Sequence, residues 1–203
     1  MSLDWSACRN ARDLGGLPTA DGGRIRAGAL WRTGHHDQLP PAAVQAARAG
    51  GVGRVVDLRW AWELEGRPSP FADDPVYRHV PMLDDVLGYV PPPDTYAPML
   101  DHNIERIGTA VRAVAHAPAG PVVVHCHAGR DRTGVLVALL LRLAGVDHRL
   151  IADDYARTDG CSPEPMLHTL THLDERYGGV APYLLRTGTD LDAQQAVRAR
   201  LRE

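Results

Sequence analysis

Short runs of β-branched residues alternate with helical patterns along much of the chain. Arg54 to Leu58 and Pro121 to His125 each follow a turn rich in glycine or proline, and the second run is apolar without alternation. Uninterrupted apolar character is typical of a parallel strand that is covered on both faces. Ile25 to Arg32 and Val76 to Val80 are weaker strand candidates. These runs predict a mostly parallel sheet.

Helical patterns lie between and after these runs. They cover Pro41 to Gly50, Ile104 to Val114, Thr133 to Leu143, Met166 to Tyr177 and Asp190 to Leu201. The second has one apolar face at spacings of three and four, whereas the third is apolar nearly all round and predicts a buried helix. Strands alternating with helices, followed by a run of helices, predict an α/β fold. We expect a central, mostly parallel sheet flanked by helices, with a helical C-terminal part.

The length of 203 residues is enough for one compact domain with a substantial core. Hydrophobic residues make up 44% and charged residues 23%, which is the mixture of an ordinary globular protein. The prolines at 91–93 form too short a patch for a linker and predict a loop. We therefore expect residues 1–203 to form a single domain.

Charge and cysteine content narrow the possible settings. A formal net charge of -3 argues against a general nucleic-acid binder, which would carry a basic excess. Three cysteines do not form a disulfide framework, which favours the reducing cytoplasm. Met1 to Arg12 does not read as a signal peptide, and Gly134 to Leu141 is far too short to span a membrane. We expect a soluble cytoplasmic protein, with export by a route without a signal peptide left open.

The segment from Val122 to Gly134 carries the most specific pattern. It reads Val-Val-Val-His-Cys-His-Ala-Gly-Arg-Asp-Arg-Thr-Gly and lies between a buried strand and a buried helix. A loop at this position points successive backbone N–H groups inward and makes a concave anion site. Gly129 permits the backbone conformation and the close approach that such a loop needs. The phosphate-binding residues that we expect are His127, Ala128, Gly129, Arg130, Asp131 and Arg132.

The same loop would activate Cys126 as a nucleophile. A thiol at a helix N-terminus, beside a guanidinium, is stabilised as the thiolate. Arg132 offers a planar fork for two phosphate oxygens, and Thr133 could donate its hydroxyl to the departing sulfur. His125 would hold the shape of the loop. The alternative is that Cys126 is an inert buried side chain, but then the whole pattern would be accidental.

A metal site is not expected in this segment. His125 and His127 flank the cysteine, but neighbours in an extended segment point to opposite faces. No second ligand pair at zinc spacing accompanies them, and the pair His35-His36 is expected at the surface. We therefore expect no metal and no other cofactor.

At these residues the sequence resembles the protein tyrosine phosphatase superfamily, whose signature is His-Cys, five residues, then Arg-Ser/Thr. More narrowly, it resembles the bacterial tyrosine-specific phosphatases, a family that includes secreted mycobacterial phosphatases acting on phosphoproteins and phosphoinositides. That family has the loop His-Cys-x-Ala-Gly-Lys-Asp-Arg-Thr-Gly, and this chain differs by having Arg130 for lysine. Further matching motifs are Asn10–Gly16, Trp31–Thr33, Val56–Arg59 and Gly178–Leu184. The resemblance covers nearly the whole chain and implies a protein-tyrosine-phosphatase-like fold.

The resemblance implies a two-step, metal-free hydrolysis. Cys126 takes the phosphoryl group as a thiophosphate, and water then releases phosphate while Arg132 and the backbone amides stabilise the charge. Asp131, inside the loop, is the implied general acid, with a structural salt bridge as its alternative role. Three other carboxylates could instead serve as a mobile-loop acid, or be merely solvated, namely Asp84, Asp85 and Asp94.

Other residues would support or regulate this site. Arg130 makes the loop more cationic and would favour multiply phosphorylated ligands, unless it is a surface arginine paired with a carboxylate. A reversible disulfide from Cys126 to Cys8 or Cys161 would protect the thiolate. Five charged residues are expected to form charge pairs beneath or around the loop, namely Arg12, Asp13, Arg32, Asp57 and Arg59.

Three functions from different classes fit this pattern. The first is a cysteine-dependent phosphomonoester hydrolase acting on phosphotyrosine proteins, with phosphoserine/threonine or phosphoinositide activity as extensions. Inorganic phosphate or a similar oxyanion would then bind in the loop. The second is a phospho-ligand-binding module without turnover. The third is an arsenate reductase or sulfur-transfer enzyme, which would need further redox cysteines close to Cys126.

Overall fold

The computed structural model describes residues 5–85 and 90–203, so the first four residues of the N-terminal segment Met1 to Arg12 lie outside it. The described residues form a five-stranded sheet in the order β1-β2-β5-β3-β4. Its strands are β1 (Arg12–Asp13), β2 (Leu30–Thr33), β3 (Arg54–Asp57), β4 (Tyr77–His79) and β5 (Val122–His125). Strands β2, β5, β3 and β4 pair in parallel, and β1 pairs antiparallel with β2. The prediction of a mostly parallel sheet is therefore confirmed.

The two strongest strand predictions are confirmed by β3 and β5, and β4 lies within the weaker candidate Val76 to Val80. The other weak candidate was placed too early, because the strand begins only at Leu30. Ile25 makes an isolated bridge with Arg202 instead. Strand β1 has only two residues, too few for an alternating pattern to be recognised.

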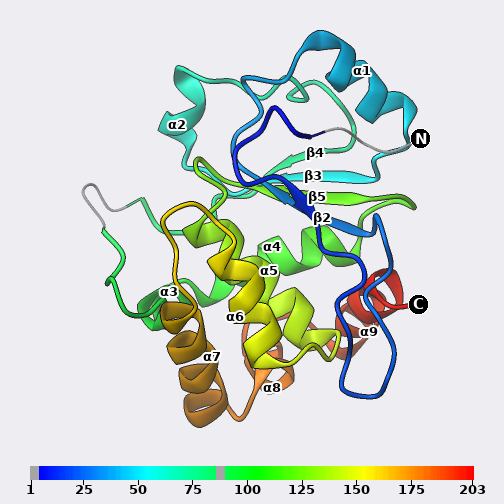
Figure 1. Ribbon diagram of the computed structural model, residues 1–203. Coiled ribbons are helices and arrows are strands. Elements are labelled where there is room, and N and C mark those ends of the chain that lie inside the picture. The colour runs from blue at the N-terminus through cyan, green and yellow to red at the C-terminus, as the bar shows by residue number, and fades with distance from the viewer. Residues whose placement is uncertain (1–4, 86–89) are drawn as a thin grey trace.

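Helices cover both faces of the sheet. They are α1 (Pro41–Ala49), α2 (Ala61–Glu65), α3 (Ala97–His102), α4 (Ile104–Ala115), α5 (Asp131–Leu143), α6 (His148–Ala156), α7 (Glu164–Tyr177), α8 (Val180–Arg186) and α9 (Leu191–Leu201). Figure 1 shows α1 and α2 on one side of the sheet and the helices from α3 to α9 on the other. All five predicted helices are present, and α5 begins two residues before the predicted start.

The central strand β5 is covered on both faces, as its apolar run predicted. Val122 and Val124 point into the large core around α5, whereas Val123 points into a smaller core beneath α1. The smaller core is built around Trp5 and Phe71. Among the described residues, no helix is long and apolar enough to cross a membrane.

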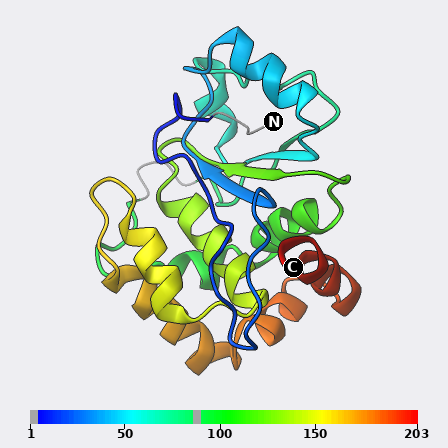
Figure 2. The ribbon, with the colours of Figure 1, turned by 45° about the vertical axis from the view of Figure 1, so that its right-hand side comes forward.

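The segment before β2 is tied to the C-terminal end of the chain. Arg26 donates its backbone N–H to the carbonyl of Leu201 at 2.7 Å, next to the bridge between Ile25 and Arg202. In Figures 1 and 2 the blue segment before β2 runs beside α9, drawn in red. This contact holds the N-terminal segment against the helical layer.

The register of the sheet brings three strand ends into one row. Thr33 at the end of β2 and Asp57 at the end of β3 both pair with His125 at the end of β5. Because the carboxyl ends of parallel strands meet at one edge, the loops that follow these strands lie side by side. The chain between β5 and α5 starts from the middle of this row.

Candidate active site

The loop between β5 and α5 is held by its carbonyl groups. Every carbonyl from Cys126 to Arg130 has a donor in the described structure. The donors are His125 Nδ1 (3.4 Å from the Cys126 oxygen), His35 N (3.0 Å, to His127), Asn10 Nδ2 (2.9 Å, to Ala128), Arg32 Nη2 (2.9 Å, to Gly129) and Gly134 N (2.7 Å, to Arg130). These contacts fix the loop with its carbonyl oxygens directed away from its centre.

The N–H groups of the same loop remain unpaired. From His127 to Thr133, none donates a hydrogen bond to another group of the described residues. The last four of these N–H groups, from Arg130 to Thr133, lie at the N-cap and in the first turn of α5, where the helix dipole adds partial positive charge. Consecutive free N–H groups at a helix N-terminus form an anion-binding concavity. The backbone geometry of the loop is compatible with an anion site, and phosphate binding by these residues stays a prediction.

Two features of the loop require glycine at position 129. Its φ of 69° lies in the left-handed region, and a Cβ placed there would be 2.5 Å from the carbonyl oxygen of Thr33. The loop therefore packs directly on the end of β2, and this close approach is possible only for glycine.

Arg132 lies at the start of α5 with its guanidinium bound by a carboxylate. Glu63 on α2 accepts from Nη1 at 2.5 Å and from Nη2 at 2.9 Å. The ring centroid of Trp60 lies 4.4 Å from the guanidinium carbon of Arg132, which adds a cation–π contact. Both charged side chains are largely buried, with 10% and 6% of their surface exposed. The arginine is therefore fixed in one place and one orientation.

Glu63 is itself anchored, and sequence reasoning missed it. Its Oε2 accepts the backbone N–H of Trp60 at 2.7 Å, which ties the side chain to the start of its own helix. Burial acts to raise the pKa of Glu63, but the hydrogen bonds and charge of Arg132 outweigh it and lower that pKa. One signal in the sequence could have identified Glu63: it lies shortly after the predicted strand Arg54 to Leu58, and the end of that strand meets the end of β5.

Cys126 is buried, with 2% of its surface exposed, at the base of the loop. The ring of the preceding residue, His125, packs against that of His36, tilted by 32° with centroids 3.9 Å apart, and His125 Nε2 lies 3.5 Å from Asp57. Burial lowers the pKa of both imidazoles. The expectation of a surface position is wrong for His36, which is 1% exposed because it packs against Trp5 and Phe71.

Thr133 has a buried hydroxyl for which the described residues provide no hydrogen-bond partner. It immediately follows Arg132 in the first turn of α5. A buried hydroxyl without a partner is costly, so it needs an explanation in the chemistry of the site.

Two predicted supporting arginines converge on an acid that was not predicted. Arg12 Nε donates to Asp154 Oδ1 at 2.8 Å, and Arg32 Nη1 donates to Asp154 Oδ2 at 3.0 Å. Burial acts to raise the pKa of Asp154, but the hydrogen bond from Arg12 and the charge of Arg32 lower it. Arg32 also holds the carbonyl of Gly129, so this buried cluster supports the loop from beneath.

Of the other three residues predicted to form charge pairs, Asp57 and Arg59 pair with each other, and Asp13 does not form an ion pair with the described residues. Arg59 binds Asp57 through two nitrogens, at 2.9 Å from Nε and 2.6 Å from Nη2. The carboxylate of Asp13 accepts backbone N–H groups from Gly15 and Gly28, and so shapes a turn.

Asp131 lies in the first turn of α5 at the rim of the loop. Its Oδ1 accepts the hydroxyl of Tyr96 at 2.5 Å and Nε of Arg130 at 3.1 Å. Arg130 is thus paired with a carboxylate, one of its two predicted roles. His127 is partly exposed and lies 3.9 Å from Glu63, on the other side of the loop.

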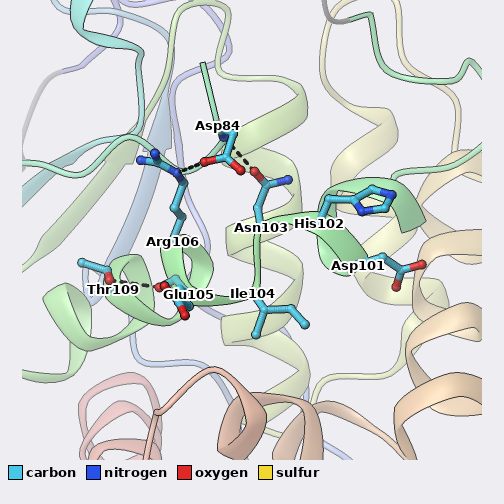
Figure 3. A pocket seen from close by; sticks show the side chains of 8 residues that line it. All are labelled: Asp84, Asp101, His102, Asn103, Ile104, Glu105, Arg106 and Thr109. Atoms are coloured by element: carbon cyan, nitrogen blue, oxygen red, sulfur yellow. Dashed lines mark hydrogen bonds and ion pairs between the residues drawn. The ribbon is translucent and has the colours of Figure 1, made fainter. Parts of the chain in front are cut away.

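The three alternative acids lie in other surroundings. Figure 3 shows Asp84 in a depression of about 550 Å³, where Arg106 Nε donates to its carboxylate at 2.6 Å. Asp85 accepts the indole N–H of Trp62 at 3.1 Å. Asp94 is exposed, and its carbonyl oxygen contacts His168. Of the four candidates, only Asp131 belongs to the loop itself.

All three cysteines are free thiols. Cys8 lies in the small core, where burial and then the charge of Asp37 raise its pKa to about 12. Cys161 is partly exposed and donates to the hydroxyl of Tyr155 at 3.2 Å. A reversible disulfide with Cys126 stays a prediction.

Comparison with known proteins gives the same assignment as the loop motif. A tyrosine phosphatase family model matches residues 3–162. A Cupriavidus necator protein named as a tyrosine-protein phosphatase is 31% identical over 171 residues, which cover 77% of this chain and 63% of the relative. The tyrosine-protein phosphatase of Nostoc commune is 32% identical over 148 residues, which cover 65% of this chain and 49% of the relative. The triple specificity protein phosphatase PtpB of Mycobacterium tuberculosis is 27% identical over 205 residues, which cover 83% of this chain and 73% of the relative.

The matched part of this chain thus spans 63% and 49% of the first two relatives, so their full lengths are not represented here. The family model, in contrast, covers most of this chain and includes the whole loop from Cys126 to Thr133. It confirms the resemblance that the motifs predicted. This chain belongs to the tyrosine phosphatase family.

Proposed function

We propose that this protein is a cysteine-dependent phosphomonoester hydrolase that acts on phosphotyrosine. The observation that carries the proposal is the backbone of the Cys126–Arg130 loop. Its carbonyl groups are all engaged from outside, while the N–H groups from His127 to Thr133 are left for an anion. A site built in this way stabilises a phosphoryl group without further rearrangement of the loop.

In the first step the sulfur of Cys126 attacks phosphorus. The S–P bond forms as the bond from phosphorus to the leaving oxygen breaks, and Asp131 gives its proton to that oxygen. The negative charge on the phosphoryl oxygens is stabilised by the loop N–H groups and by Arg132.

In the second step water attacks the thiophosphate. The carboxylate of Asp131 takes a proton from the water as the new O–P bond forms and the S–P bond breaks. The departing sulfur regains negative charge, and the buried hydroxyl of Thr133 supplies a hydrogen bond to it. This role accounts for a hydroxyl that has no partner among the described residues.

The pairing of Arg132 with Glu63 supports this role for the arginine. A guanidinium has five N–H donors in a fixed fork. Glu63 accepts one from Nη1 and one from Nη2, which leaves Nε–H and a second hydrogen on each terminal nitrogen. A phosphoryl group can bind along the Nε edge while Glu63 keeps its place, so Glu63 orients the arginine instead of competing for it.

For substrate range, we propose phosphotyrosine proteins first and phosphoserine/threonine peptides or phosphoinositides second. One relative, PtpB, is named for triple specificity. Arg130, with 45% of its side chain exposed beside the loop, would contact additional anionic groups on a substrate.

The first experiment is hydrolysis of p-nitrophenyl phosphate in the presence of EDTA by the wild type and Cys126→Ser. Cys8→Ala is the matched control, because Cys8 lies in the small core and outside the loop. Activity in the wild type and in Cys8→Ala, with none in Cys126→Ser, supports the proposal. Phosphotyrosine peptides, phosphoserine peptides and dispersed phosphoinositides then rank the substrates.

Two results would contradict the proposal. Substantial turnover by Cys126→Ser would show that another group is the nucleophile. Inactivity of all three proteins, with inorganic phosphate still bound by the wild type in calorimetry, would favour a phospho-ligand-binding module.

A further inference from the structure

A chain of hydrogen bonds ends on one oxygen of Asp131. The Tyr96 hydroxyl lies 2.5 Å from Asp131 Oδ1 and 2.5 Å from the hydroxyl of Tyr155, which in turn lies 3.2 Å from the sulfur of Cys161. Arg130 Nε reaches the same Oδ1 at 3.1 Å. No hydrogen bond from the described residues reaches the other oxygen, Oδ2 of Asp131.

The direction of this chain follows from the number of available hydrogens. A tyrosine hydroxyl carries one hydrogen, and the charged oxygen of Asp131 is the strongest acceptor near Tyr96. Tyr96 therefore donates to Asp131 and accepts from Tyr155, which in turn accepts from the thiol of Cys161. The cationic donor Arg130 on the same Oδ1 further disfavours a proton there. When Asp131 is protonated, its proton is carried by Oδ2.

Tyr96 cannot easily move away from this position. It is 6% exposed, and its backbone N–H donates to Thr169 on α7 at 2.7 Å. Its ring meets that of Tyr155 edge-on, with centroids 5.9 Å apart. Burial and then the hydrogen bond to Asp131 raise the pKa of Tyr96, so it remains a donor.

The start of α5 is shaped to accept this arrangement. A Cβ at Gly134 would lie 2.8 Å from the ring of Tyr155. A larger residue would push Tyr155 away from α5 and with it the hydroxyl that supports Tyr96. Glycine at this position of the loop motif therefore leaves room for the ring of Tyr155.

The chain of hydrogen bonds borders a small depression beside the loop. The depression has a volume of about 260 Å³, and its walls include Asp131, Tyr96, Cys161 and the prolines 91–93. Pockets for drug-sized ligands hold about 300–1,000 Å³, so this one suits a single ring or short side chain. Arg130 and Asp131 both line it, so the depression adjoins the loop.

We propose that Tyr96 is a positioning residue for the general acid: it fixes Oδ1 of Asp131 as an acceptor, so that Oδ2 delivers the proton to a leaving group in this depression. The inference rests on the proposed function. Tyr96 touches neither phosphorus nor the leaving oxygen and acts only through Asp131.

Five charged or titratable groups of the described residues surround Asp131. They are Arg130 in the loop, Arg132 on α5, Tyr96 before α3, Tyr155 on α6 and Cys161 after α6. Burial raises the pKa of both tyrosines and of Cys161, which keeps them neutral near pH 7. Removing the Tyr96 hydroxyl takes one of the two described donors from Oδ1 of Asp131 and leaves Arg130 Nε.

The test compares Tyr96→Phe with the wild type on aryl phosphates of graded leaving-group basicity. Tyr183→Phe is the matched control, because it also removes a buried tyrosine hydroxyl, bonded to the carbonyl of Leu100. For the poorest leaving groups we expect Tyr96→Phe to lose about tenfold in kcat, short of the roughly hundredfold or larger loss for Asp131→Asn. For p-nitrophenyl phosphate, whose leaving group needs little help from a proton, the loss in kcat should be small, and KM should stay close to that of the wild type.

Tyr155→Phe, which leaves the Tyr96 hydroxyl in place, should show a weaker effect in the same direction. If the loss of kcat in Tyr96→Phe showed the same leaving-group dependence as in Tyr183→Phe, the inference would be overturned. Carbon-13 NMR of the Asp131 carboxyl at a single pH separates this inference from the proposed function, because it needs no turnover. The carboxyl resonance should move in Tyr96→Phe and stay in place in Tyr183→Phe, and an unchanged resonance in both variants would overturn the inference even in an inactive protein.

Discussion

Glu63 on α2 accepts two hydrogen bonds from Arg132 on α5, although the two residues are 69 positions apart in the sequence. The arginine is also stacked by Trp60, so its fork is oriented before any substrate arrives. Preorganisation of this kind reduces the free energy needed to align a charged group during the reaction.

Replacing Glu63 by glutamine should therefore lower kcat/KM. We expect a loss of roughly tenfold to a hundredfold, the scale that follows when a reacting group is displaced by about 1 Å. The control is Glu65→Gln, an exposed residue of the same helix, which should stay close to the wild type. Stronger inhibition of Glu63→Gln by inorganic phosphate would mean that Glu63 competes with the ligand, and the positioning role would be wrong.

The choice of general acid can be tested with four matched substitutions. Asp131→Asn should reduce kcat by about a hundredfold or more for aryl phosphates with poor leaving groups, because general acid catalysis is worth that much. Asp84→Asn, Asp85→Asn and Asp94→Asn should remain within about twofold of the wild type, since these carboxylates lie outside the loop. A large, leaving-group-dependent loss in one of these three would move the acid there.

Substitution of Gly129 by alanine should cost both stability and activity. The left-handed φ alone destabilises an alanine, and the Cβ would also meet the end of β2 at 2.5 Å. We expect a loss of more than about 1 kcal/mol in the free energy of unfolding and at least tenfold in kcat/KM. Gly22→Ala isolates the first effect, because Gly22 has φ 86° but open space around it. Equal destabilisation of the two variants would contradict the close contact.

The buried cluster of Asp154 with Arg12 and Arg32 should make stability depend on pH. The pKa of Asp154 is lowered in the folded protein, whereas an unfolded aspartate has a pKa of about 3.9. Its contribution is therefore fully present above that unfolded value and is lost as the pH falls towards the lower folded pKa. Urea unfolding between pH 7 and pH 3 should show a smaller acid-induced decline for Asp154→Asn than for the wild type.

The same cluster predicts a large effect of truncating Arg32. Arg32→Ala removes one partner from a buried ion pair and leaves the Gly129 carbonyl without its donor. Breaking a buried pair in this way costs about 3–5 kcal/mol. Arg157→Ala is the control, because Arg157 lies 3.8 Å from the same Asp154 but is 67% exposed. Similar melting temperatures for the two variants would contradict a structural role for Arg32.

The sequence was sufficient for the parts of the site that are local. The loop, the buried strand before it and the buried helix after it form one continuous segment, so its pattern alone predicted Cys126 and Arg132, and the family resemblance added Asp131. The parallel sheet followed from the apolar strand β5, and the long helices followed from their periodicity.

The parts that sequence reasoning missed depend on distant contacts. Glu63 lies on a helix of five residues, too short for a periodic pattern, and reaches Arg132 only because the ends of β3 and β5 meet. Tyr96 and Tyr155 come from separate segments and look like ordinary core residues until their hydroxyls converge on Asp131. His36 was misplaced because its aromatic neighbours Trp5 and Phe71 are remote in sequence.

The strand register that aligns Thr33, His125 and Asp57 limits where residues can be inserted in this chain. Side chains alternate between the faces of a strand, so a slip of β3 by one residue would place Val56 beneath the loop instead of Asp57. The same slip would move Arg59 and the start of α2, and with it Glu63. Insertions should therefore be tolerated in the surface turns but not between Arg54 and Glu63, where the chain length sets the positions of Asp57, Arg59 and Glu63.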